Sequence, residues 1–101
     1  MRYRLSRTAR RELDGILAYW TERAGQAIAE SIVDSIIDRF PLVRDFPEAG
    51  RACGDFAPGL RCLPAGDYLI YYKKTRAIVS ILHILHGARN QKRALRRPKS
   101  R

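Results

Sequence analysis

The chain has 101 residues, of which 46% are apolar, and a formal net charge of +10. This length fits one domain with a single modest core, and the apolar content argues against a disordered chain. No apolar run approaches the roughly 20 residues that a membrane span needs, so we expect a cytoplasmic protein without a membrane partner.

The charge is unevenly distributed along the chain. All ten acidic residues lie at or before Asp67, and ten of the twenty Lys and Arg balance them there. The whole excess of +10 therefore falls in residues 68–101. Such a field indicates nucleic acid, an anionic membrane surface or an acidic protein as the partner. For residues 92–101 the alternative is a basic tail that only aids solubility.

The N-terminal part has the pattern of a strand followed by a helix. Arg2 to Leu5 is short and mixed, and predicts a first strand. Ser6 has the side chain of a helix N-cap, and Gly25 is typical of the residue at which a helix ends. Between them, apolar residues recur at helical spacing, namely Ala9, Leu13, Ile16, Leu17, Trp20 and Ala24.

A second helix is predicted to begin near Gln26. Pro41 should end or kink it, because proline lacks the backbone N–H. The connection between the two helices is very short, so they should form an antiparallel hairpin. The apolar stripe of the second helix consists of Ile28, Ile32, Ile36 and Phe40.

The remainder of the chain predicts a long loop and then strands. Asp45–Gly59 contains three glycines and two prolines without a sustained period, which is typical of a loop. The last strand should be central and covered on both faces, because it is apolar at both parities. The two helices cover one face, and a different chain is a candidate to cover the other. The predicted strands are Leu60–Leu63, Tyr68–Lys73 and Ala77–His86, joined by turns at 64–67 and 74–76.

Histidines and cysteines are the remaining chemical groups of interest. His83 and His86 are three residues apart on a predicted strand, so they should point to opposite faces and not share a metal. We expect His83 to be a hydrogen-bonded core residue, whereas His86 is either a site residue or a cap at the rim of the sheet. Cys53 and Cys62 match no metal or redox spacing. We expect reduced thiols, with a disulfide between them as the alternative.

Four segments carry a resemblance to a known family. They are RLSRTARRELDGILAYW at 4–20, FPEAGR at 46–51, PGLRCLPAGDYLIYY at 58–72 and ILHILHGARN at 81–90. In this order they resemble the RelE/ParE superfamily of bacterial toxins, and the last two are close to the ParE pattern. The resemblance implies an α+β domain of β-α-α-β-β-β order over residues 1–91, with a basic tail at 92–101. Its helical hairpin would pack on a mostly antiparallel sheet of three to four strands.

The resemblance also implies partners. A cognate antitoxin, encoded beside the toxin, would wrap and block it, and the complex would bind operator DNA mainly through the antitoxin. ParE members poison DNA gyrase, whereas RelE members cleave mRNA on the ribosome.

The residues favour the ParE activity, which is not enzymatic. RNA cleavage needs a proton acceptor, a proton donor and cations that hold the developing phosphorane charge. Arg61 and Arg89 keep two basic positions of RelE, but Tyr68 occupies a third, and Leu95 falls where RelE has a C-terminal tyrosine. The alternative is a RelE-like endoribonuclease, for which the catalytic candidates are Arg61, His86 and Arg89. A family member that acts mainly as an operator corepressor is a third possibility.

We therefore expect two binding surfaces and neither a cofactor nor a metal site. The residues expected to contact the target are Arg61, Tyr68, His86, Arg89, Lys92 and Arg93. The residues expected to contact the antitoxin are Leu13, Leu17, Trp20, Tyr71 and Ile84.

Overall fold

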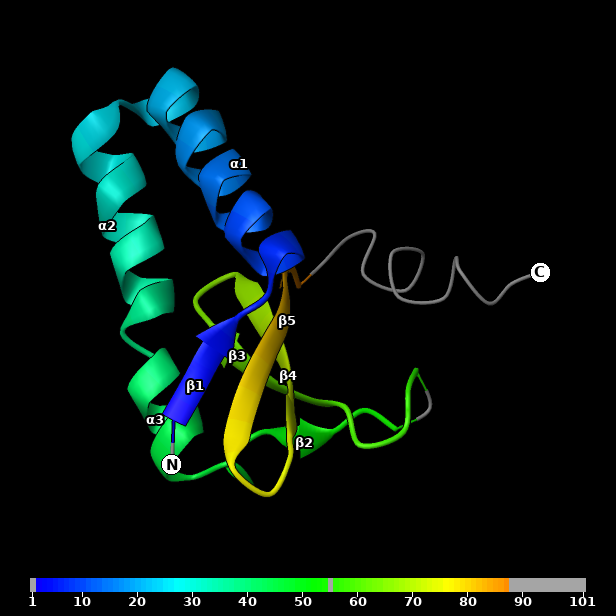
Figure 1. The fold of residues 1–101 in the computed structure, drawn as a ribbon. Helices are drawn as coiled ribbons and strands as arrows, with labels where there is room; N and C mark the ends of the chain where they lie inside the picture. The colour runs from blue at the N-terminus through cyan, green and yellow to red at the C-terminus, as the bar shows by residue number, and fades with distance from the viewer. Residues whose placement is uncertain (1, 55, 88–101) are drawn as a thin grey trace.

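The computed structural model describes residues 2–54 and 56–87 as helices packed on one sheet (Figure 1). The elements in chain order are β1 (Arg2–Leu5), α1 (Arg7–Ala24), α2 (Gln26–Ile37), α3 (Phe40–Asp45), β2 (Arg51–Ala52), β3 (Arg61–Ala65), β4 (Tyr68–Lys74) and β5 (Ile78–His86). The α+β class and the order of the main elements are confirmed. Two short elements, α3 and β2, were not expected.

The sheet has the strand order β1-β5-β4-β3-β2. β1 pairs in parallel with β5, and the remaining pairs are antiparallel. The strand predicted to be central, β5, is an interior strand, but the middle position belongs to β4. The reason is that only β1 lies on one side of β5, whereas β4, β3 and the short β2 follow one another on its other side.

The two predicted ends of the first helix are confirmed. The hydroxyl of Ser6 accepts a hydrogen bond of 3.0 Å from the backbone N–H of Ala9, and it also donates one to Leu82 O. Gly25 adopts φ 94°, a conformation that disfavours other residues, and it ends α1 and begins α2. The connection is therefore one residue long, and α1 and α2 lie side by side as a hairpin (Figure 1).

The second helix is shorter than predicted. α2 ends at Ile37, and Phe40 begins the separate helix α3 instead of closing the apolar stripe of α2. Pro41 lies in the first turn of α3, where its missing N–H has no intrahelical partner to lose. The prediction that Pro41 ends or kinks the second helix therefore placed the break too late, because α2 already ends at Ile37 and Pro41 lies inside α3.

The predicted first strand of the C-terminal half is also displaced. β3 runs through Pro64 and Ala65, which we expected in a turn, so the turn contains only Gly66 and Asp67. Pro64 is tolerated because β2 pairs only with Arg61 and Cys62, which leaves β3 at Pro64 with a free edge in the described part of the chain. The residue Gly66 has φ 62°, as a tight hairpin turn requires.

Apolar side chains fill both faces of the sheet. The larger cluster lies between the sheet and the helices and includes Ile36, Phe40, Ile70, Tyr72 and Ile81. The smaller cluster, which we call the back-face cluster, consists of the buried residues Cys53, Leu60, Cys62 and Tyr71 with Phe56, Ala57, Leu69, Leu82 and Leu85 packed against them. The segment between β2 and β3 thus covers part of the face for which the sequence indicated a different chain.

Cys53 and Cys62 are free and buried, with their sulfur atoms 3.1 Å apart. This agrees with the expected reduced thiols. Within the described residues, no helix is long and apolar enough to cross a membrane.

Candidate functional site

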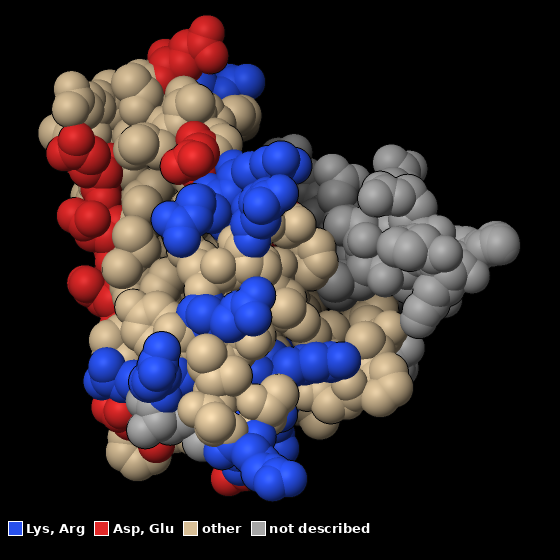
Figure 2. All heavy atoms as spheres, in the orientation of Figure 1, with Lys and Arg blue, Asp and Glu red and all other residues tan. Residues whose placement is uncertain are grey.

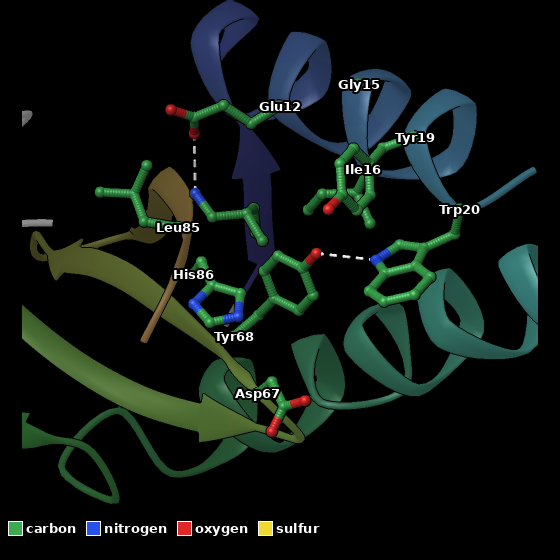
Figure 3. A pocket seen from close by; sticks show the side chains of 10 residues that line it. Glu12, Gly15, Ile16, Tyr19, Trp20, Asp67, Tyr68, Leu85 and His86 are labelled. Carbon is green, nitrogen blue, oxygen red and sulfur yellow. Dashed lines mark hydrogen bonds between the residues drawn. The ribbon is translucent and has the colours of Figure 1, made fainter. Parts of the chain in front are cut away.

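A pocket of about 480 Å³ lies between α1 and the ends of the β4–β5 hairpin (Figure 3). Glu12, Tyr19 and Trp20 line it from the helix, and Tyr68 and His86 line it from paired positions on β4 and β5. Three aromatic rings and an imidazole in one hollow provide flat apolar surface together with polar edges. Such a hollow can bind an apolar or aromatic side chain of a partner.

The aromatic floor of the pocket is held by contacts between elements. The indole Nε1 of Trp20 donates a hydrogen bond of 2.9 Å to the hydroxyl of Tyr68, which Figure 3 shows across the pocket. The ring of His86 meets the ring of Tyr68 edge to face, with centroids 5.4 Å apart. These contacts fix the orientation of Tyr68 and Trp20 before any partner arrives.

Glu12 closes the edge of β5 where β1 no longer covers it. β1 pairs with β5 only as far as Leu5, which lies opposite Ile81. Beyond that point, Glu12 Oε1 accepts a 2.8 Å hydrogen bond from the backbone N–H of Ile84, and Oε2 lies 3.2 Å from His83 Nδ1. The carboxylate therefore acts as a side-chain substitute for the missing strand and orients the imidazole at the same time.

The position of His83 differs from the expected core position. Its side chain is 29% exposed, and its hydrogen bond is to Glu12. The pairing of β4 with β5 shifts register between Tyr71 and Tyr72, which lie opposite His83 and Ile81 respectively. This bulge puts an extra residue into β5. The alternation of side chains between the two faces is interrupted there, so His83 does not share the face of Val79 and Ile81.

Among the expected target-binding residues that the structure describes, Tyr68 and His86 come together in the pocket, whereas Arg61 lies apart from them. Arg61 lies opposite Tyr72 on β3, and its guanidinium donates a 2.6 Å hydrogen bond to Gly50 O. His86 lies opposite Tyr68, at the other end of β4 and on the other side of it. Tyr68 itself is 9% exposed. Arg89, Lys92 and Arg93 lie outside the described residues.

The residues expected to meet the antitoxin divide into two groups. Leu13, Tyr71 and Ile84 are buried in this chain, with exposed fractions of 7% or less. Leu17 and Trp20 are half-buried, and Trp20 lines the pocket. Of the five, Leu17 and Trp20 thus present the larger accessible surface.

Sequence reasoning missed Glu12 as a member of the site. Its two partners, His83 and Ile84, are 71 and 72 residues away along the chain. The signal was present: Glu12 lies on the helix beside the apolar stripe, and it is the first carboxylate after five arginines. Across residues 2–54 and 56–87, no three His, Cys, Asp or Glu side chains come together as metal ligands.

Comparison with known proteins agrees with this fold and with the resemblance seen in the sequence. Residues 3–91 match the family described as the ParE toxin of the type II toxin–antitoxin system parDE. The chain is 30% identical over 86 residues to the protein named Toxin ParE1 from Mycobacterium tuberculosis, covering 84% of this chain and 88% of the relative. It is 27% identical over 88 residues to Toxin ParE1 from Caulobacter vibrioides, covering 87% and 91%.

A solved structure shares the fold. It is described as the chromosomal ParDE system from P. aeruginosa, and it superposes with a TM-score of 0.76 at 20% identity over 85% of this chain and 95% of that chain. The family match spans nearly the whole described sequence, from β1 to beyond β5. The chain belongs to the ParE toxin family of type II toxin–antitoxin systems.

Proposed function

We propose that this chain is a cytoplasmic toxin that poisons DNA gyrase and that an antitoxin encoded beside it neutralises it. The family membership supports the toxin–antitoxin role, since the matching family is described by that system. The net charge of +10 supports a target that carries bound nucleic acid, as gyrase does when it holds DNA.

The observation that carries the choice of gyrase is the separation of Arg61 from His86. A ribonuclease needs its cation and its proton-transfer group at one phosphate. Arg61 and His86 lie opposite Tyr72 and Tyr68, four residues apart along β4. That separation corresponds to about 13 Å along the strand, before the width of the sheet is added. Arg61 is also engaged with Gly50 O, which gives it a structural role.

The second candidate is a ribosome-dependent endoribonuclease, and the pair Glu12–His83 favours it. A carboxylate that lies against one imidazole nitrogen is the arrangement that orients a histidine as a general base. His83 keeps 29% of its side chain exposed, so a substrate has access to it.

The antitoxin is proposed to occupy the pocket on α1. Half-buried Leu17 and Trp20, together with the 42% exposed Tyr19, offer apolar surface along one side of this helix. An amphipathic segment of the antitoxin would place an apolar side chain between them and Tyr68, as helices do in hydrophobic grooves. Through this partner the complex would reach its operator DNA.

The function is tested by inducing the chain in a bacterial host, alone and with the neighbouring antitoxin gene. A gyrase poison causes DNA-damage signalling and filamentous cells, and co-expression of the antitoxin abolishes both effects. The variant Arg89→Ala should reduce toxicity with little loss of folding. Arg51→Ala, on β2, is its control. Rapid loss of translated mRNA without DNA damage would favour the endoribonuclease instead, and growth unaffected by induction would contradict both activities.

A further inference from the structure

The two cysteines of the back-face cluster lie closer together than packing alone requires. Cys53 directly follows β2 and Cys62 lies on β3, and their Sγ atoms are 3.1 Å apart. Carbon atoms in a packed core approach one another to about 3.5–4.0 Å, and sulfur is larger than carbon. Both residues are 1% exposed, so this is a close contact in the interior and not a meeting of two mobile surface groups.

The main chain holds the two cysteines on the same face of the sheet. Arg51 on β2 pairs with Cys62, and the N–H of Cys53 continues this ladder by donating to Leu60 O at 2.7 Å. Because side chains alternate between the faces of a sheet, Cys53 shares the face of Arg51 and of its partner Cys62. The two thiols are therefore diagonal neighbours whose separation is fixed by backbone hydrogen bonds.

A bond between the two sulfur atoms would need only a small movement. The sulfur atoms of a disulfide are about 2.05 Å apart, so each thiol has to move by less than about 1 Å. The intervening segment is already folded back on itself, since Phe56 N donates to Cys53 O and Leu60 N donates to Ala57 O. A crosslink that fits the native backbone in this way mainly constrains the unfolded chain and stabilises the folded one.

A metal ion explains the close pair less well than a disulfide does. Zinc in a structural site takes four protein ligands, usually cysteine and histidine. In the part of the chain that the structure describes, no group of three His, Cys, Asp or Glu side chains could hold a metal ion. Oxidation of the two thiols needs no further ligand.

The surroundings of the pair indicate which thiol reacts first. Burial and the contact with Cys53 raise the pKa of Cys62 to about 12. Cys62 therefore keeps its proton at neutral pH, and since the thiolate is the reactive form of a cysteine, the reaction begins at Cys53. Hydrogen peroxide is small and uncharged, so a brief local opening is enough to admit it to this site.

We propose that Cys53 and Cys62 are an oxidation site, at which a peroxide converts the two thiols into an intramolecular disulfide that joins the end of β2 to β3. The sulfur of Cys53 attacks one peroxide oxygen, the O–O bond breaks, and a sulfenic acid and one water form. The sulfur of Cys62 then attacks that of Cys53. The S–S bond forms, the S–O bond breaks, and the hydroxyl leaves with the proton of Cys62 as a second water.

Two electrons pass from the two thiols to the peroxide in these steps. Two molecules of a small thiol reduce the disulfide again and become a disulfide themselves, so the modification is reversible. The inference depends neither on the target nor on the antitoxin proposed above, because it concerns the opposite face of the sheet from the pocket on α1.

The first experiment treats the reduced, folded full chain with hydrogen peroxide. We expect a mass lower by that of two hydrogen atoms, a monomer on a non-reducing gel, and no thiol left to alkylate after denaturation. The controls Cys53→Ala and Cys62→Ala retain one thiol each and should not lose the two hydrogen atoms. In the unchanged protein, a gain of oxygen atoms without a disulfide, a covalent dimer, or two thiols that both remain free would each overturn the proposal.

The second experiment asks whether the fold favours the bond, and it needs no variant. The ratio of disulfide to dithiol is measured in mixtures of reduced and oxidised glutathione, once in buffer and once in urea that unfolds the chain. A crosslink that stabilises the fold is stabilised by the fold to the same extent, so the equilibrium constant should be larger for the folded chain by about tenfold or more. Equal constants, or a larger constant in urea, would show that the geometry does not favour the disulfide and would overturn the proposal.

Discussion

Gly50 lies against the ring of Tyr72, at a point where no side chain fits. The hydroxyl of Tyr72 accepts a hydrogen bond from Gly50 N at 2.8 Å and donates one to Pro47 O at 2.7 Å. A Cβ at position 50 would come within 2.5 Å of that hydroxyl oxygen and 2.7 Å of the backbone oxygen of Cys62. The backbone oxygen belongs to β3 and is less able to move aside than a flexible side chain.

The replacement Gly50→Ala should therefore lower the free energy of unfolding by about 1–3 kcal/mol, the range for forcing atoms into a packed site. Urea unfolding measures the change. Gly54→Ala is the control, because nothing lies within 4 Å of a Cβ at that position. Equal stability of the two variants would contradict the assigned contact.

The carboxylate of Glu12 accepts a hydrogen bond from a main-chain N–H of β5. Its replacement by alanine removes the acceptor of the Ile84 N–H, and an unsatisfied polar group in a partly buried place costs about 1–3 kcal/mol. Glu12→Gln keeps an oxygen acceptor and should cost less than half as much. Glu22→Ala, an exposed carboxylate on the same helix, is the control. Thermal and urea unfolding decide, and similar losses for Glu12→Gln and Glu12→Ala would contradict the role of the acceptor.

Residues with local roles could be predicted from the sequence, whereas those with distant partners could not. Ser6 and Gly25 act on neighbours in the chain, so their types alone indicated a cap and a helix end. Glu12 and Arg61 have partners that only the folded chain brings near. Arg61 was expected to contact the target, and no residue pattern indicated that Gly50 O would occupy it.

At the scale of elements, length decided which predictions were right. α1, with 18 residues, and β5, with nine, show sustained patterns and were predicted almost to their ends. α3 has six residues and β2 has two, which is too short for a period to be recognised. α3 depends on packing against β1 and β5, and β2 depends on pairing with β3. The bulge opposite Tyr71 and Tyr72 likewise has no signature in the amino-acid composition.

The back-face cluster makes the stability of the sheet sensitive to alkaline pH. Burial raises the pKa of Tyr71 from 10.0 to about 12, and burial next to Cys53 raises that of Cys62 from 9.0 to about 12. The folded chain thus keeps protons that the unfolded chain has already lost. This stabilisation is fully present below pH 9 and is lost as the pH rises toward 12.

We expect the free energy of unfolding to fall between pH 9 and 12, and the fall to be shallower in Tyr71→Phe, which has no phenol to ionise. Urea unfolding at a series of pH values measures the slope. The control Tyr19→Phe removes the hydroxyl of a tyrosine that is 42% exposed and lies outside the back-face cluster. A slope unaffected by Tyr71→Phe would show that the buried phenol does not contribute.

At the scale of the whole molecule, the sequence predicted the fold class and family but hid the distribution of charge. Summing residues 1–67 gave zero, yet five arginines, from Arg2 to Arg11, precede every carboxylate and lie on β1 and the first half of α1. A sum over a segment cannot reveal this, because α2 carries its acidic residues to another side of the molecule (Figure 2). The arginines that precede Glu12 and the excess of Lys and Arg in residues 68–101 are thus two separate sources of positive charge along the chain.

The most direct measurement of the proposed activity uses purified toxin with gyrase and supercoiled plasmid, beside a ribosome programmed with mRNA. The account predicts that the toxin traps gyrase-cleaved DNA, that added antitoxin prevents the trapping, and that the mRNA stays intact. Codon-specific cutting of the mRNA with unchanged gyrase supercoiling would contradict the account and assign the chain to the ribosome.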